Sequence, residues 1–111
     1  MSITERRFRL GILAVDGCML SSIASASDAL RVAQTLSDIR HPNGGLRLET
    51  VVFGARGQDR IRTSVGLDLS GLGPPPEDLD LLLLPGLMHN STHDLIERVT
   101  SMQPELELLR A

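Results

Sequence analysis

Residues 79–86 read LDLLLLPG, the most apolar segment of a chain of 111 residues. Four consecutive leucines leave no polar side for solvent, so a strand formed here needs cover on both faces. That pattern is typical of a central strand in a parallel sheet, and Pro85-Gly86 would end the strand sharply. The segment therefore predicts an α/β fold with residues 79–86 at the centre of a parallel sheet.

The sequence after this strand predicts helices. Ser91 is followed three residues later by Asp94, a variant of the capping box, and we expect that helix to end near Met102. Pro104 then begins a second helical segment, PELELLRA. Because no further strand follows to complete the sheet, we expect the chain to be an incomplete, N-terminal portion of a larger domain.

The region before residue 79 begins with the same kind of pattern. Residues 8–15 (FRLGILAV) form an apolar run that predicts a buried strand. Ser21 or Ser22 can cap the helix that follows. The inward face of this helix is predicted by residues at helical spacing, namely Ile23, Ala26, Leu30 and Ala33.

The middle of the chain alternates turns and short strands. Residues 41–45 (HPNGG) form a turn cluster, and 46–54 predict a second strand. Residues 61–71 indicate two short extended pieces joined near Gly66, and the three prolines of 73–78 indicate a rigid loop. The order strand, helix, strand, strand, helix is that of an α/β domain with a parallel sheet.

Composition limits the classes of function. The net charge is only -3, and two phenylalanines are the only aromatic residues, so the chain has neither the basic charge nor the stacking platforms that bind nucleic acid. No apolar run is long enough for a transmembrane helix, so we expect no membrane contact. The single cysteine excludes an internal disulfide and fits a cytoplasmic location.

That cysteine, Cys18, follows the first predicted strand and lies near a helix start. A helix N-terminus can lower the pKa of a thiol and favour the nucleophilic thiolate. However, no histidine lies near it in the sequence to act as a base, and free cysteine is among the most buried residue types. We therefore interpret Cys18 as a packing residue at the rim of a pocket.

Two histidines follow the leucine-rich strand, where open parallel sheets usually carry ligand sites. His89 and His93 are four residues apart with Asp94 beside them, which would suit a metal ion if one helix carried all three. The helix start near Ser91 instead separates the two histidines. We favour histidines that line a pocket mouth or face solvent.

Asp16, at the end of the first predicted strand, has two interpretations. It could be a catalytic carboxylate with a raised pKa, because ligand sites collect at this end of a sheet. Asp-Gly is, however, first of all a turn pair, so a residue that closes the Asp16-Gly17 turn is the favoured interpretation.

Three segments, taken in order, are similar to motifs of a known family. IRTSVGLDL (61–69) is similar to a Thr-Ser-x-Gly-Leu segment, and DLDLLLLPG (78–86) to a strand ending in Pro-Gly-Gly. VDGCMLSSIASASDAL (15–30) keeps the pattern of a first turn and helix at Gly17, Leu20, Ala24, Asp28 and Leu30. Together they resemble the ThiJ/PfpI superfamily of class I glutamine amidotransferase-like proteins. Most narrowly, they resemble the N-terminal domain of GlxA-type regulators in the AraC family, over roughly residues 7–111.

This resemblance implies a flavodoxin-like parallel sheet flanked by helices, in the sensor domain of a transcription regulator. Residues 1–111 would be the N-terminal part of that domain, and DNA would be bound only by a C-terminal helix-turn-helix domain of the parent protein. The superfamily's nucleophilic cysteine would lie beyond Ala111. The glutamate of its enzymes aligns with Leu20, the aspartate of its regulators with Ser22, and the second glycine of Pro-Gly-Gly with Leu87. These departures favour a non-catalytic role.

We therefore expect a ligand-sensing or dimerisation domain that forms a homodimer, binds an unidentified small-molecule effector, and needs no cofactor or metal. One alternative is a ThiJ/PfpI-type amidase, hydrolase or glyoxalase-like enzyme whose nucleophile follows residue 111. Another is a stand-alone flavodoxin-like module whose missing strands come from a partner. The expected ligand-binding residues are Asp16, Cys18, Ser21, Ser64, Gly86, Leu87, His89 and Asn90. The small-residue helix face of Ser22, Ser25 and Ala29 is a candidate for close packing against a partner subunit, although packing on the chain's own sheet is the plainer explanation.

Overall fold

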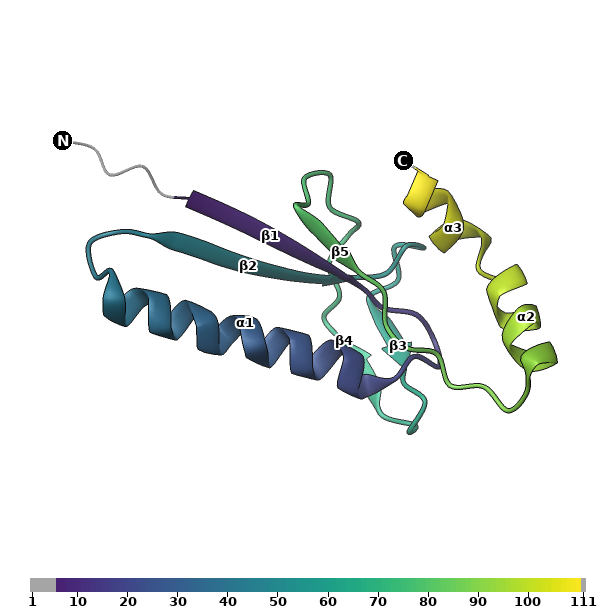
Figure 1. Ribbon diagram of the computed structural model, residues 1–111. Coiled ribbons are helices and arrows are strands. Elements are labelled where there is room, and N and C mark those ends of the chain that lie inside the picture. Colours follow the sequence, from purple (N-terminus) through teal and green to yellow (C-terminus); the bar gives the residue numbers. More distant parts are fainter. Residues whose placement is uncertain (1–5, 111) are drawn as a thin grey trace.

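The computed structural model describes residues 6–110, and these contain a three-stranded parallel sheet flanked by helices (Figure 1). The strand order is β2-β1-β5, formed by β1 (Arg6–Leu13), β2 (Leu46–Phe53) and β5 (Leu81–Leu83). Both neighbours of β1 run parallel to it. Helix α1 (Leu20–Arg40) connects β1 to β2 along one side of the sheet. The predicted α/β class, in a flavodoxin-like arrangement, is confirmed.

The remaining elements lie near the carboxyl ends of the strands (Figure 1). β3 (Arg60–Arg62) and β4 (Asp68–Ser70) form an antiparallel hairpin, with Gly66 at a φ of +84° between them. This confirms the two short extended pieces predicted in 61–71. Helices α2 (Thr92–Thr100) and α3 (Gln103–Arg110) follow β5, and no helix in residues 6–110 has the length and apolar character needed to cross a membrane.

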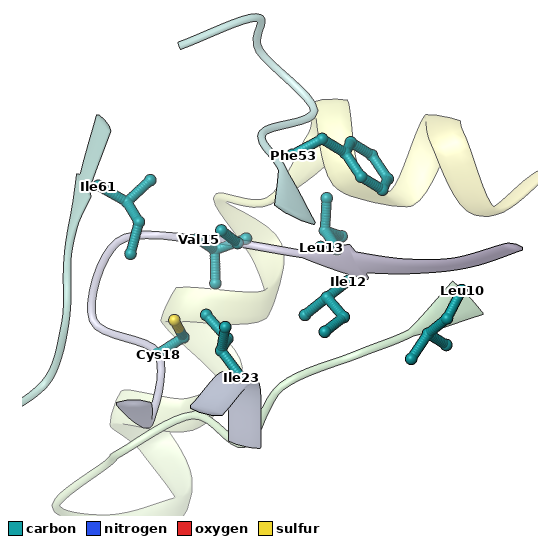
Figure 2. Close-up of a cluster of buried hydrophobic side chains, with 9 residues drawn as sticks. Leu10, Ile12, Leu13, Val15, Cys18, Ile23, Phe53 and Ile61 are labelled. Atoms are coloured by element: carbon teal, nitrogen blue, oxygen red, sulfur yellow. The ribbon is translucent and has the colours of Figure 1, made fainter. Parts of the chain in front are cut away.

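The core is built around β1. In Figure 2 Leu10 and Ile12 point to one side of this strand, whereas Leu13 and Phe53 point to the other. All four side chains are buried, as expected for a strand with cover on both faces. The run predicted at 8–15 is shifted, since the strand covers 6–13, and Ala14 and Val15 continue as buried chain.

The prediction that residues 79–86 form the central strand is wrong. β5 covers only Leu81–Leu83, and β1 is the strand with a neighbour on each side. Within residues 6–110 no strand pairs with the outer edge of β5, and Leu81 and Leu84 are each 53% exposed. An apolar sequence shows that a strand needs cover, but it does not show which strand of the sheet receives it.

The start of α1 also differs from the prediction. The N-cap residue is Met19, which makes no side-chain cap, while Ser21 and Ser22 lie inside the first turn. The backbone N–H of Met19 donates to the carbonyl of Gly86 at 2.8 Å, so a contact distant in the sequence fixes where the helix begins. Serine caps are therefore not needed here.

The predicted inward face of α1 is correct in its first half. Ile23 is buried, and Ala26 and Leu30 pack against the core. Ala33 is exposed. In this half of the helix Gln34 faces the sheet instead, because its side-chain amide bonds the backbone of β2.

The predicted start of α2 is confirmed. The backbone N–H of Asp94 donates to Ser91 Oγ at 3.1 Å, and the Asp94 carboxylate accepts from the N–H of Asn90 at 3.0 Å. The helix ends at Thr100, two residues before the predicted end at Met102. Pro104 lies in the first turn of α3, where its missing N–H is tolerated.

Candidate functional site

The turn after β1 is joined to the hairpin by three hydrogen bonds. Arg62 donates its backbone N–H to Asp16 Oδ1 at 2.9 Å, and Gly17 donates its N–H to the carbonyl of Arg62 at 2.7 Å. Ser64 donates its N–H to the carbonyl of Cys18 at 2.9 Å. Asp16 and Gly17 thus occupy a turn, as predicted, and the Asp16 side chain connects that turn to β3.

The same turn is held on another side by the loop after β5. Gly86 accepts the N–H of Met19 and donates its own N–H to Ser22 Oγ at 2.9 Å. Cys18 and Leu87 form an isolated antiparallel bridge. Ser22, which the resemblance aligned with an aspartate, therefore binds the backbone of the Pro-Gly segment.

Arg98 of α2 completes the assembly. Its Nη2 atom donates to the carbonyl of Asp16 at 2.7 Å, and its guanidinium lies directly over Gly17. A side chain at Gly17 would overlap with that guanidinium, and the φ of +80° also favours glycine. Four parts of the chain, namely the β1 turn, β3, the β5 loop and α2, therefore meet at the carboxyl end of β1.

An open cleft of about 640 Å³ lies where these segments meet. Four of the residues predicted to bind a ligand line it together: Asp16, Ser64, His89 and Asn90. They come from the β1 turn, the β3–β4 connection and the loop before α2. That they bind a ligand stays a prediction.

Several cleft residues were missed by the sequence reasoning. They are Arg62, Thr63, Met88 and Arg98, whereas Asp94 was considered only as a metal ligand and a helix-cap residue. Arg98 lies 82 positions from Asp16, and only the packing of α2 against the β1 turn brings the two together. The Ser91 cap, which fixes where α2 starts, was the one sequence signal that bore on the position of Arg98.

The other predicted binding residues do not line this cleft. Cys18 is buried in the core, and Ser21 is exposed on the first turn of α1. Gly86 uses its backbone groups to hold Met19 and Ser22, and Leu87 lines a separate apolar cavity. Their part in ligand binding likewise stays a prediction.

Most charged side chains of the cleft make hydrogen bonds within the protein that fix the surrounding segments. The Asp16 and Asp94 carboxylates each accept a backbone N–H. Arg62 Nε lies 2.9 Å from Asp68 Oδ1 outside the cleft, and this hydrogen bond holds the pKa of Asp68 below its usual range. With two acidic and two basic side chains, the cleft has no strong net charge, and its arrangement suits a polar ligand held by hydrogen bonds.

Cys18 lacks the environment of a nucleophile. It is completely buried, and burial raises the pKa of its thiol above the usual range, with hydrogen bonds to backbone groups acting in the opposite direction. A reactive cysteine needs a lowered pKa and access to substrate. The interpretation of Cys18 as a packing residue agrees with this environment.

The two histidines are separated as the sequence indicated. His89 lies in the loop before α2, with Nδ1 3.3 Å from the carbonyl of Leu87. His93 lies within α2, with Nε2 3.1 Å from Glu97 Oε1. Within residues 6–110, no cluster of three or more His, Cys, Asp or Glu side chains is arranged to hold a metal ion.

Comparison with solved structures gives a likeness in fold. No model of a protein family matches the sequence, and no curated protein matches it. The fold is similar to that of a solved AraC family transcriptional regulator from Pseudomonas putida, with a TM-score of 0.55 and 16% sequence identity. The match covers 85% of this chain and 56% of the regulator's chain, so this chain spans little more than half of that protein. At this identity the likeness establishes a shared fold.

Proposed function

We propose that the chain is the N-terminal part of a ThiJ/PfpI-like sensor domain in an AraC-family transcriptional regulator, that it is non-catalytic, and that it acts as a cytoplasmic homodimer. A small-molecule effector binds in the cleft at the carboxyl end of β1. DNA is bound by a C-terminal helix-turn-helix domain of the parent protein. The fold shared with the Pseudomonas putida regulator supports this assignment, as do the family-like segments 15–30, 61–69 and 78–86.

The observation that carries the proposal is the cleft itself. It joins segments from four parts of the chain, so a ligand that contacts Asp16, Ser64 and Asn90 also bridges the β1 turn, the hairpin and the segment before α2. Such a ligand favours one relative placement of these segments over others. A sensor domain requires a ligand that binds one arrangement of its segments more tightly than the others.

The outer face of α1 supports the homodimer. Val32, Leu36 and Ile39 are 58%, 49% and 71% exposed, and they recur at helical spacing. Figure 1 shows α1 along one side of the sheet with its outer side uncovered by other described elements. Ser25 and Ala29, from the predicted small-residue face, are exposed on the same stripe. Ser22 is instead bonded to Gly86.

In this proposal a second copy of α1 occupies the stripe. Val32, Leu36 and Ile39 all lie on one face of a single helix, so a two-fold axis would bring the same apolar residues of two subunits together.

A binding screen tests the effector cleft. The 111-residue chain, labelled with ¹⁵N, is titrated with the standard amino acids and the small mono- and dicarboxylates of central metabolism. We expect at least one compound to give saturable shifts of the Gly17, Ser64 and Asn90 amides. Ser64→Ala should weaken that binding, whereas Ser70→Ala on β4, outside the cleft, should not. If none of the compounds gives saturable shifts at the cleft, the sensor assignment is wrong.

A further inference from the structure

The turn between α1 and β2 contains an asparagine followed by a glycine, Asn43-Gly44. In Figure 1 this turn lies at the end of the sheet away from α2 and α3. Asn43 and Gly44 are both exposed. The Asn43 carboxamide makes no hydrogen bond with another residue in 6–110, so no such bond fixes its position.

An asparagine-glycine pair has a characteristic chemistry. The backbone nitrogen of the glycine can bond to Cγ of the asparagine, which expels ammonia and closes a cyclic imide that water then opens. Glycine permits this reaction because it has no Cβ to obstruct the approach. The chain contains a second pair that can form the same imide, Asp16-Gly17, with water as the leaving group. The two pairs differ in how firmly the fold holds them.

The fold locks the pair Asp16-Gly17. The Gly17 N–H donates to the carbonyl of Arg62 at 2.7 Å, and Asp16 Oδ1 accepts the N–H of Arg62 at 2.9 Å. The Arg98 guanidinium lies directly over Gly17. Closing the imide here would break both hydrogen bonds and displace Arg98, so the folded state protects this pair from reaction.

The fold leaves the pair Asn43-Gly44 open. The Gly44 N–H donates to the carbonyl of His41 at 3.2 Å, which is long for a hydrogen bond of this type. Within residues 6–110 no hydrogen bond or ion pair holds the Asn43 side chain away from the Gly44 nitrogen. Exposed turns open locally without unfolding the sheet. Imide closure at Asn43 therefore needs a much smaller rearrangement than closure at Asp16.

We propose that Asn43 is a modification site, at which the asparagine of the folded protein converts spontaneously to aspartate and isoaspartate with water as the co-reactant. The Gly44 nitrogen gives its proton to a base in the solvent and bonds to Asn43 Cγ, while the carboxamide C–N bond breaks and ammonia leaves with a proton. Water adds to either carbonyl of the imide and breaks the bond from that carbonyl to nitrogen. One opening gives aspartate, and the other gives isoaspartate, whose extra carbon lies in the main chain. The proposal does not depend on the function of the effector cleft.

Isoaspartate at this turn would disturb the start of β2. The carbonyl of Gly45 accepts the N–H of Arg6 at 3.3 Å, and Gln34 Nε2 donates to the carbonyl of Leu46 at 3.1 Å. These bonds tie the first residues of β2 to β1 and to α1. An added main-chain carbon just before them shifts their partners out of register. The new carboxylate also lies beyond the C-terminus of α1, where a negative charge is unfavourable.

Ageing of the purified 111-residue chain tests the site. One sample is kept folded and a second is kept in urea at the same mildly alkaline pH. Cleavage after arginine then releases residues 41–47, and mass spectrometry with chromatography measures aspartate and isoaspartate. Asn43 should convert at similar rates in both samples, whereas folding should slow isomerisation at Asp16 many-fold. If folding slows Asn43 as strongly as Asp16, or if Asn43 does not convert in the folded chain, the proposal is wrong.

Asn90 and one variant supply the controls. Asn90 is also exposed, but the Cβ of Ser91 obstructs the following nitrogen, so Asn90 should convert many-fold more slowly than Asn43. Asn43→Gln has a longer side chain that closes the ring poorly, and it should stay unmodified. Ageing should reduce hydrogen-exchange protection of the Arg6 and Leu48 amides in the wild type but not in this variant. Equal conversion of the two asparagines, or equal loss of protection in both chains, would overturn the proposal.

Discussion

The Asp16 carboxylate accepts a hydrogen bond from the backbone N–H of Arg62 at 2.9 Å, across 46 positions of sequence. It joins the turn after the central strand β1 to the hairpin. Together with the Arg98 contact to the Asp16 carbonyl, it sets the shape of the cleft. Asp16 is thus chiefly a structural acceptor at the site where a sensor would bind its effector.

Removing that acceptor should destabilise the fold modestly. Asp16→Ala leaves the Arg62 N–H without its partner, so the free energy of unfolding should fall by about 1 kcal/mol. Asp16→Asn keeps a side-chain oxygen and should cost less. Urea unfolding followed by circular dichroism measures both, with Glu107→Ala as an exposed control. Equal stabilities for Asp16→Ala and the wild type would contradict the role given to this bond.

Gly17 should be more sensitive to substitution than another glycine with the same backbone conformation. Gly17→Ala meets the Arg98 guanidinium and also pays for a φ of +80°. Gly57→Ala is the matched control, because its φ is +75° but no atom lies within 4 Å of the added methyl group. Each substitution should cost about 1 kcal/mol from backbone strain, and Gly17→Ala should cost more because Arg98 must move. The same unfolding assay tests this, and equal losses for the two variants would show that Arg98 does not pack against Gly17.

Cys18 should give the protein a pH dependence in alkaline solution. Burial raises the pKa of the folded-state thiol, so the folded chain holds its proton after the unfolded chain has lost it. The contribution of Cys18 to the free energy of unfolding should therefore be constant up to about pH 8.5, and should fall as the pH rises from there to the folded-state pKa. Cys18→Ala should remove this alkaline slope.

The reactivity and function of Cys18 provide a second check on its role. A thiol-specific disulfide reagent should react with native Cys18 far more slowly than with the urea-unfolded chain. Cys18→Ala should leave the biological activity of the parent protein intact. Loss of that activity with unchanged folding would identify a chemical role for the thiol and would revive the enzyme alternative.

The exposed stripe on α1 should be required for self-association. Leu36→Lys places a charge at its centre, so sedimentation velocity should show dissociation to monomer. Val65→Lys, at an exposed apolar residue between β3 and β4, should leave the association unchanged. A wild-type chain that stays monomeric at all concentrations would refute the α1 interface.

The sequence predicted best those features that depend on neighbouring residues. The Ser91 cap involves residues three positions apart, and Asp16-Gly17 is a local turn, so both could be recognised in advance. The caps proposed at Ser21 and Ser22 failed because Gly86, far along the chain, fixes the start of α1. The exposure of Leu81 depends on strand order, which its own segment does not encode.

The charged residues of the site were the least predictable. Arg98 and Glu105 lie on short amphipathic helices, where charged side chains usually face solvent. Glu105 is buried and Arg98 is half-buried because α2 and α3 pack against the turns after β1 and β2. No pattern within either helix distinguishes these residues from Glu97 or Glu107, which are exposed.

A transcriptional reporter tests the central claim most directly. The 111-residue chain is fused ahead of a DNA-binding domain that represses its operator only as a dimer, and repression is compared with that of the DNA-binding domain alone. The account predicts repression by the fusion, its loss with Leu36→Lys but not with Val65→Lys, and a change in repression on adding a compound that binds the cleft. A fusion that represses no more than the isolated DNA-binding domain, although it is folded and equally abundant, would contradict the assignment of this chain as a regulator's sensing and dimerisation module.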